Sequence, residues 1–118
     1  MEKRGGKKVI ISTTPSLEGK IIKEYRGVVF GEVISGIHFM KDFTSRFTDM
    51  LGGRAEEYEE ELVNARADAI NEMIERAKKI GANALVGVKI DIEIAGGDES
   101  KAISMLVVTA SGTAVVVE

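Results

Sequence analysis

Cysteine and tryptophan are absent from this chain of 118 residues, and histidine and proline occur once each. Without cysteine the chain can form no disulfide, and it offers no thiolate for catalysis or for a soft metal ion. One histidine is too few to build the cage of Cys and His ligands that holds structural zinc. A chain without a disulfide framework is expected in the cytoplasm.

Long apolar runs and a strong excess of one charge are also missing. No apolar stretch approaches the roughly 18 residues of a membrane helix, and the start, MEKRGGKK, lacks the apolar region of a signal peptide. The formal net charge is −3, which gives no general attraction to nucleic acid or to an anionic membrane, so we expect neither partner. The length fits a single domain, residues 9–118, behind a flexible basic tail, residues 1–8.

The clearest pattern in the sequence predicts a long amphipathic helix that ends before Gly81. Small and apolar residues recur at the three- and four-residue spacing of one helix face, at Leu62, Ala65, Ala69, Met73, Ala77 and Ile80. Glutamates crowd the start of this segment and basic residues crowd its end, as the helix dipole favours. Gly81 is expected to adopt the left-handed conformation that caps a helix. A shorter helix is predicted from Asp42 to the turn at Gly52-Gly53-Arg54, which opens the long helix.

Strand patterns precede the helices. A short strand at residues 9–13 ends before Pro15, because proline donates no hydrogen bond to a neighbouring strand. Residues 20–25 and 27–34 are predicted to be strand, either as two strands or as one long strand bent near Gly27.

Two further strands follow the long helix and are joined by a glycine-rich hairpin loop. In residues 86–94 apolar and charged residues alternate. We expect Val86, Val88, Ile90, Ile92 and Ile94 on one face of the sheet, and Lys89, Asp91 and Glu93 on the other. The last strand, residues 102–117, is expected to bulge or bend at Gly112. The order of elements predicts the α+β class, with a small antiparallel or mixed sheet backed by one long and one short helix.

The strands carry more apolar surface than one long helix can cover. Residues 28–30, 105–108 and 115–117 are apolar at consecutive positions, so both faces of these strands need burial. The sequence predicts no other segment that could cover the second face of the sheet. We therefore expect a closed, symmetric homo-oligomer. The alternative is that these runs mark strands in a cramped monomeric core.

Several separated motifs resemble the YbjQ-like family, small bacterial and archaeal proteins described as heavy-metal-binding domains. The matching stretches, in order, are STTPSLEG (12–19), EYRGVVFGE (24–32), KDF (41–43), DMLGGR (49–54), YEEEL (58–62), AR (65–66), GANALVGVKIDIE (81–93) and SGTAV (111–115). This resemblance implies a dodecin-like subunit assembled as a pentameric ring, and it implies a metal-binding role.

A chain with no cysteine and one histidine could still bind a divalent metal ion in two ways. A cyclic oligomer could hold the ion in a ring of His38 side chains around its axis, or Asp91 and Glu93 could bind a harder ion. The alternative for His38 is an ordinary loop or interface histidine. The alternative for the two carboxylates is a solvated or subunit-facing strand surface.

An anion site is a third possibility, because free amides at a helix start suit phosphate. Gly52 and Gly53 with Arg54 are the candidate residues, although the glutamates that follow would repel an anion and the glycines could simply form a turn. No nucleotide-binding fingerprint or catalytic triad motif is present. We therefore expect a binding protein without catalysis, and the alternative to metal is a pocket between subunits for a small organic ligand or an anion.

Overall fold

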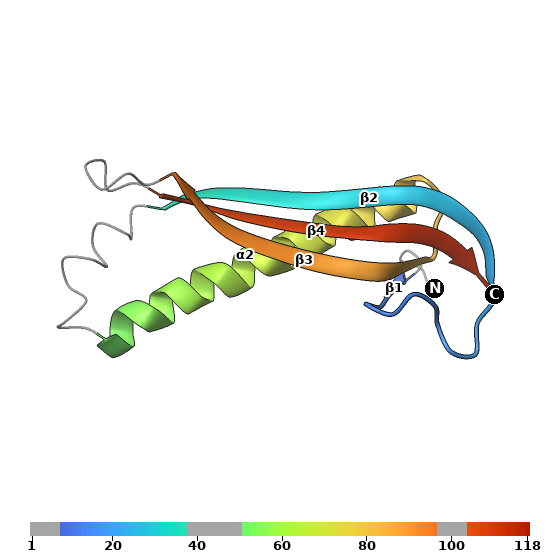
Figure 1. The fold of residues 1–118 in the computed structure, drawn as a ribbon, viewed down its shortest axis with the longest axis horizontal. Helices are drawn as coiled ribbons and strands as arrows, with labels where there is room; N and C mark the ends of the chain where they lie inside the picture. The colour runs from blue at the N-terminus through green and yellow to red at the C-terminus, as the bar shows by residue number, and fades with distance from the viewer. Residues whose placement is uncertain (1–7, 38–50, 97–103) are drawn as a thin grey trace.

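The computed structural model describes residues 8–37, 51–96 and 104–118 and shows a curved sheet with a long helix along one face (Figure 1). The elements are β1 (Ile10–Ile11), β2 (Ile22–Ile37), α2 (Leu51–Lys79), β3 (Ala84–Gly96) and β4 (Ser104–Val117). The strand order is β1-β3-β4-β2, in which β1 runs parallel to β3 and the other neighbours are antiparallel. The predicted α+β fold with a mixed sheet is therefore confirmed. No helix of the described ranges is long and apolar enough to cross a membrane.

Several predicted elements lie outside the described residues. These are residues 1–7 of the predicted tail, most of the predicted short helix, and the predicted hairpin loop beyond Gly96. The strand β2 is continuous, which is the second of the two predicted alternatives, and its register with β4 shifts between Tyr25 and Gly27, where the strand bends.

The helix α2 is longer than predicted at its start and ends as predicted. It begins at Leu51, so Gly52, Gly53 and Arg54 lie in its first turn and not in a turn ahead of it. At its end Gly81 has a φ of 83°, its amide donates to the carbonyl of Lys78, and the amide of Ala82 donates to the carbonyl of Ala77. These two bonds form a Schellman cap, which only a residue tolerant of positive φ can complete without strain.

A seam of small residues lets α2 approach the sheet closely. Ala65, Ala69, Met73 and Ala77 of the predicted helix face are buried against Ala110, Ala114 and the larger apolar residues of the sheet. Gly31 of β2 is buried under the helix, where an added Cβ would overlap the carbonyl oxygen of Ala69 and lie 2.7 Å from the amide nitrogen of Met73. The close packing of helix and sheet thus depends on the missing side chain of one glycine.

A bulge in β3 divides this strand into two parts that bury opposite faces. The register with β4 shifts between Val86 and Lys89, and Gly87 within the shift has a φ of 61°. Val86 therefore packs on the face away from α2, whereas Val88 packs toward the helix. The prediction that both share one face is wrong, because the extra residue reverses the alternation. The bulge predicted at Gly112 is also wrong, since the extra residue lies on β3, opposite Gly112.

The face of the sheet away from α2 is covered at one end by the chain between β1 and β2. Leu17 of this segment and Ile22, the first residue of β2, pack there on a second small core, which consists of Ala84, Val86, Val115 and Val117. The segment is fixed by backbone hydrogen bonds from Val88 to Ser12 and from Gly87 to Thr14. The expectation that no segment of the chain covers this face is therefore wrong at this end. Beyond this end, the described residues on this face include exposed apolar side chains, among them Val28 and Ile34 at 65% each.

Candidate functional site

The exposed part of the sheet surface that faces away from α2 is the candidate site, and we call it the open face. Residues paired across the antiparallel strands point to the same side, so the register identifies its members. They are Val28, Phe30, Glu32 and Ile34 of β2, Met105, Val107, Thr109, Ser111 and Thr113 of β4, and Lys89, Asp91 and Glu93 of β3. Apart from Glu32, the face is thus apolar along β2, and it is rich in hydroxyl groups along β4 and charged along β3.

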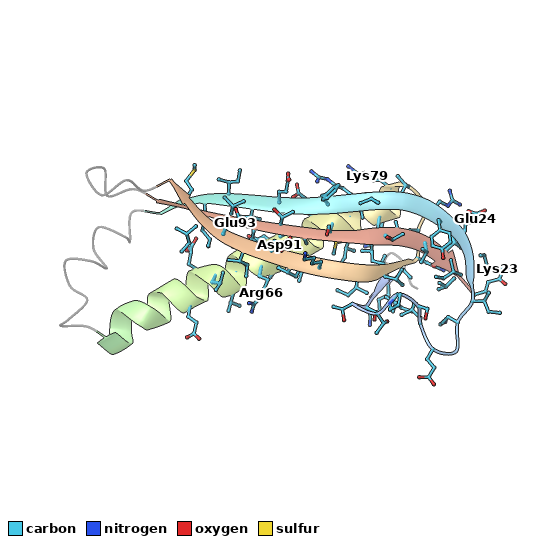
Figure 2. All side chains as sticks on the ribbon, viewed as in Figure 1. Lys23, Glu24, Arg66, Lys79, Asp91 and Glu93 are labelled. Carbon is cyan, nitrogen blue, oxygen red and sulfur yellow. The ribbon has the colours of Figure 1, made fainter. Side chains whose placement is uncertain are left out.

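Asp91 and Glu93 lie side by side on the open face, as the alternation in the sequence predicts. They are two residues apart on β3, roughly 7 Å along a strand, and both side chains point away from α2 (Figure 2). Thr109 pairs with Asp91 on one side and with Glu32 on the other. Glu32 and Asp91 are therefore separated by two strand spacings, roughly 10 Å, with a hydroxyl group between them.

One lysine accompanies these carboxylates. Lys89 Nζ lies 3.9 Å from Asp91 Oδ1, and both side chains are mostly exposed. An exposed pair of this kind contributes little to stability and can open when another cation approaches. The open face therefore carries three carboxylates against one lysine, which favours a cation over an anion.

A single chain does not complete a metal site within the described ranges. No group of three or more His, Cys, Asp or Glu side chains there is arranged to hold an ion. Asp91 and Glu93 offer two carboxylates, whereas Ca²⁺ takes six to eight oxygen ligands and Mg²⁺ takes six. The remaining ligands would have to come from water or from a second copy. His38, the other predicted ligand, lies outside the described residues, so the predicted ring of imidazoles stays a prediction.

The predicted anion site is separate from the open face. The backbone of Gly52, Gly53 and Arg54 forms the first turn of α2, where the amides have no partner within the helix. This end of the helix lies clear of the strands (Figure 1), so the structure does not bring these residues together with Asp91 and Glu93. The anion site stays a prediction from the sequence.

Two side chains of α2, those of Glu72 and Arg76, bond to the edge of the sheet. Arg76 Nη1 donates to the carbonyl of Phe30 at 2.7 Å, and the amide of Glu32 donates to Glu72 Oε1 at 2.8 Å. Glu72 and Arg76 are themselves ion-paired at 2.9 Å. These side chains occupy backbone groups that an added strand would use, so they close the edge of β2 at this point. Their i, i+4 spacing was the sole signal in the sequence, and it does not indicate a distant partner.

Comparison with known proteins gives a consistent result. A model of the YbjQ family, described as "Putative heavy-metal-binding", matches residues 9–118. UPF0145 proteins of Listeria monocytogenes and Listeria welshimeri are 56% identical over 110 residues, which is 93% of this chain and 96% of each relative. A crystal structure of a protein of unknown function from the DUF74 family of Pediococcus pentosaceus is similar with a TM-score of 0.63 at 15% identity, covering 93% of this chain and 98% of the other. At that identity the likeness shows the fold alone.

Proposed function

We propose, from the fact that this chain belongs to the YbjQ family, that it is a non-catalytic binding protein whose assembled copies hold a divalent metal ion on the open face. The observation that carries the proposal is the pair of neighbouring, exposed carboxylates, Asp91 and Glu93, on a sheet surface that α2 leaves uncovered. Because one chain supplies too few ligands, the proposed site takes the rest from a second copy or from water. The proposed assembly is the homo-oligomer expected from the sequence, and the number five comes from the family resemblance alone.

The donor set favours a harder ion than the family description names. Carboxylate and hydroxyl oxygens suit Ca²⁺, Mg²⁺ and Mn²⁺, whereas soft heavy metals select thiolate and thioether ligands. The chain has no cysteine, and the open face offers Asp91, Glu93 and the hydroxyl of Thr109. The proposed ligand is therefore a hard divalent cation. Borderline ions such as Zn²⁺ and Ni²⁺ would instead require His38.

Thermal unfolding with and without added ions tests the proposed site. We expect Mn²⁺ or Ca²⁺ to raise the melting temperature of the wild-type protein, since an ion at 100 times its Kd stabilises by about 2.7 kcal/mol. The double variant Asp91→Asn/Glu93→Gln should lose this shift. The control, Asp68→Asn/Glu59→Gln, removes the same charge from the exposed surface of α2 and should keep it.

Two other results would contradict the carboxylate site. If no divalent ion raises the melting temperature of the wild-type protein, and elemental analysis finds no bound metal, the proposed metal role is wrong. If Zn²⁺ or Ni²⁺ raises the melting temperature and His38→Ala alone abolishes this rise, the metal binds to the ring of His38 side chains and not to Asp91 and Glu93.

A second candidate is a small organic ligand held between two copies. The observation that favours it is the half-exposed ring of Phe30 in one row with the hydroxyl of Ser111, because a ring and a hydroxyl group together suit a planar, partly polar molecule. Native mass spectrometry would reveal it as extra mass on the assembled protein without metal. An anion at the start of α2 would instead give a stabilisation by phosphate that Arg54→Gln removes.

A further inference from the structure

The two edges of the sheet differ in how their backbone groups are occupied. Side chains of α2 bond to the edge of β2, as described above. On the other edge, β1 pairs only with Ala84 and Leu85, at one end of β3 (Figure 1), and the chain after β1 accepts hydrogen bonds from the amides of Gly87 and Val88. Within residues 8–37, 51–96 and 104–118, no other group bonds to this edge beyond Val88.

The backbone groups of Ile90, Ile92 and Ile94 point out from the uncovered part of β3, which we call the free edge. The amide of Val88 points outward, toward the chain after β1, and the pairing with β4 runs without a shift from Lys89 onward. In regular antiparallel pairing every second residue turns its amide and carbonyl away from the partner strand. The free edge therefore presents a row of amides and carbonyls of the kind that an added strand uses.

The side chains beside the free edge determine the chemistry of the strand that fits. On the open face, Asp91 and Glu93 are exposed carboxylates. On the face that carries α2, Ile92 and Ile94 are exposed by 41% and 48%, because the helix packs mainly on β2 and β4. The side chains of an added strand alternate in the same way, so basic residues would lie beside the carboxylates and apolar residues beside the isoleucines.

We infer that the free edge binds an extended segment of another protein in which basic and apolar residues alternate. The segment extends the sheet by one strand, and its backbone bonds to Ile90, Ile92 and Ile94. The ion pair between Lys89 and Asp91 is long, at 3.9 Å, and exposed, so Asp91 can turn to a basic residue of the added strand. This inference goes beyond the proposed function, because the backbone bonds need no metal ion.

Two free edges fit each other poorly. The chain after β1 covers β3 up to Val88, so a symmetric pairing of two free edges is centred near Ile92 and brings Asp91 of each copy opposite Glu93 of the other. Like charges directly opposite each other on paired strands are destabilising. The edge of β2 is a poor partner as well, because side chains of α2 bond to its backbone. The charges therefore select a basic strand.

A defined peptide tests strand addition. The probe is a labelled peptide of alternating lysine and valine, about eight residues long, mixed with the full chain in a chelator so that no metal ion competes for the carboxylates. By fluorescence anisotropy the wild-type protein should bind it, and should bind a peptide of alternating glutamate and valine at least tenfold more weakly. Asp91→Asn/Glu93→Gln should weaken binding of the lysine peptide about fivefold to tenfold, whereas Asp68→Asn/Glu59→Gln should leave it unchanged.

Methylation of the peptide backbone separates strand addition from simple charge attraction. The lysine amides and the valine amides of an added strand point in opposite directions, and only one set faces the free edge. Methylating one set alone should therefore abolish binding: the valine amides if the added strand is antiparallel to β3, and the lysine amides if it is parallel. Methylating the other set should change the affinity by less than about twofold.

A substitution in the free edge gives the matching test on the protein. Ile92→Pro removes one outward amide, which an edge strand tolerates, and should weaken binding about tenfold. Ile92→Val keeps this amide and should bind like the wild-type protein. Circular dichroism confirms that each variant is folded.

Three results would overturn the inference. They are no binding by the wild-type protein, equal binding of the lysine and glutamate peptides, and binding that survives methylation of either set of amides. The proposed metal role is tested apart from this, by the thermal shifts with Mn²⁺ or Ca²⁺, so the failure of one proposal is distinguished from the failure of the other.

Discussion

Replacing Gly31 by alanine is the sharpest test of how the helix and the sheet fit together. The new methyl group would overlap the carbonyl oxygen of Ala69 and would lie 2.7 Å and 3.0 Å from the amide nitrogen of Met73 and the carbonyl carbon of Ala69. All three atoms belong to the backbone of α2, so no side-chain rotation relieves the overlap. The helix would have to move away from the sheet by about 1 Å, and a gap of that size forfeits a quarter to a half of each contact along the seam.

The expected loss of stability follows from this displacement. Overpacking a well-packed core costs about 1–3 kcal/mol, and a backbone that cannot yield places Gly31→Ala near the upper end. Alanine restricts the unfolded chain and returns about 0.4–1 kcal/mol, so we expect a net loss of about 2–3 kcal/mol. For a domain of this size that lowers the melting temperature by roughly 10 °C. Thermal unfolding followed by circular dichroism, at one fixed protein concentration, measures it.

Gly112→Ala provides the matched control. Gly112 is also buried under α2, but a Cβ there would meet side-chain atoms, with Val88 Cγ2 closest at 3.0 Å. Side chains can give way by a few tenths of an ångström, so we expect this variant to stay within about 1 kcal/mol of the wild-type protein. A Gly31→Ala variant as stable as Gly112→Ala would refute the close approach of α2 to β2.

Three other substitutions test local features. Asn83→Ala removes the bonds of the Asn83 amide to the amide and carbonyl of Val117, at 2.8 Å and 3.0 Å, and should cost about 1–3 kcal/mol in urea unfolding. Gly81→Ala forces an alanine to adopt a φ of 83° and should lower the free energy of unfolding by about 1 kcal/mol in the same measurement. The comparison variant Ala67→Gly changes helix propensity alone. Arg76→Ala frees the carbonyl of Phe30, so we expect little loss of stability but faster aggregation by light scattering; unchanged aggregation would contradict the edge-closing role of Arg76.

The elements could be predicted where the signal is local. The helix face from Ala65 to Ala77, the cap at Gly81 and the long strand bent near Gly27 each follow from spacing and glycine conformation, and the structure confirms all three. The resemblance of separated motifs to the YbjQ-like family is confirmed too. For the helix face, the cap and the bend, a few residues close in the sequence contain the whole physical reason.

Predictions failed where one residue or one distant contact decides the outcome. The bulge at Gly87 moves Val86 to the opposite face, and nothing in the alternation of apolar residues reveals where an extra residue sits. The bonds from Glu72 and Arg76 to β2 join segments about forty residues apart, which spacing along the helix cannot show. Of the candidate site, the shared face of Asp91 and Glu93 could be predicted, but the position of Glu32 in the same row required the strand register.

The bulge at Gly87 also determines how this strand responds to a change in its length. Deleting Gly87 would remove the extra residue, so Val88 alone would stand between Val86 and Lys89, and strict alternation would leave Lys89, Asp91 and Glu93 pointing away from α2. If Gly87 were instead kept and paired in strict alternation without the bulge, these three side chains would turn toward α2. Burying charged groups costs several kcal/mol for each, which is comparable with the about 5–15 kcal/mol that holds an ordinary domain together. The strand therefore tolerates loss of the extra residue, whereas a register that keeps it without the bulge would exchange the polar and apolar faces of half the strand.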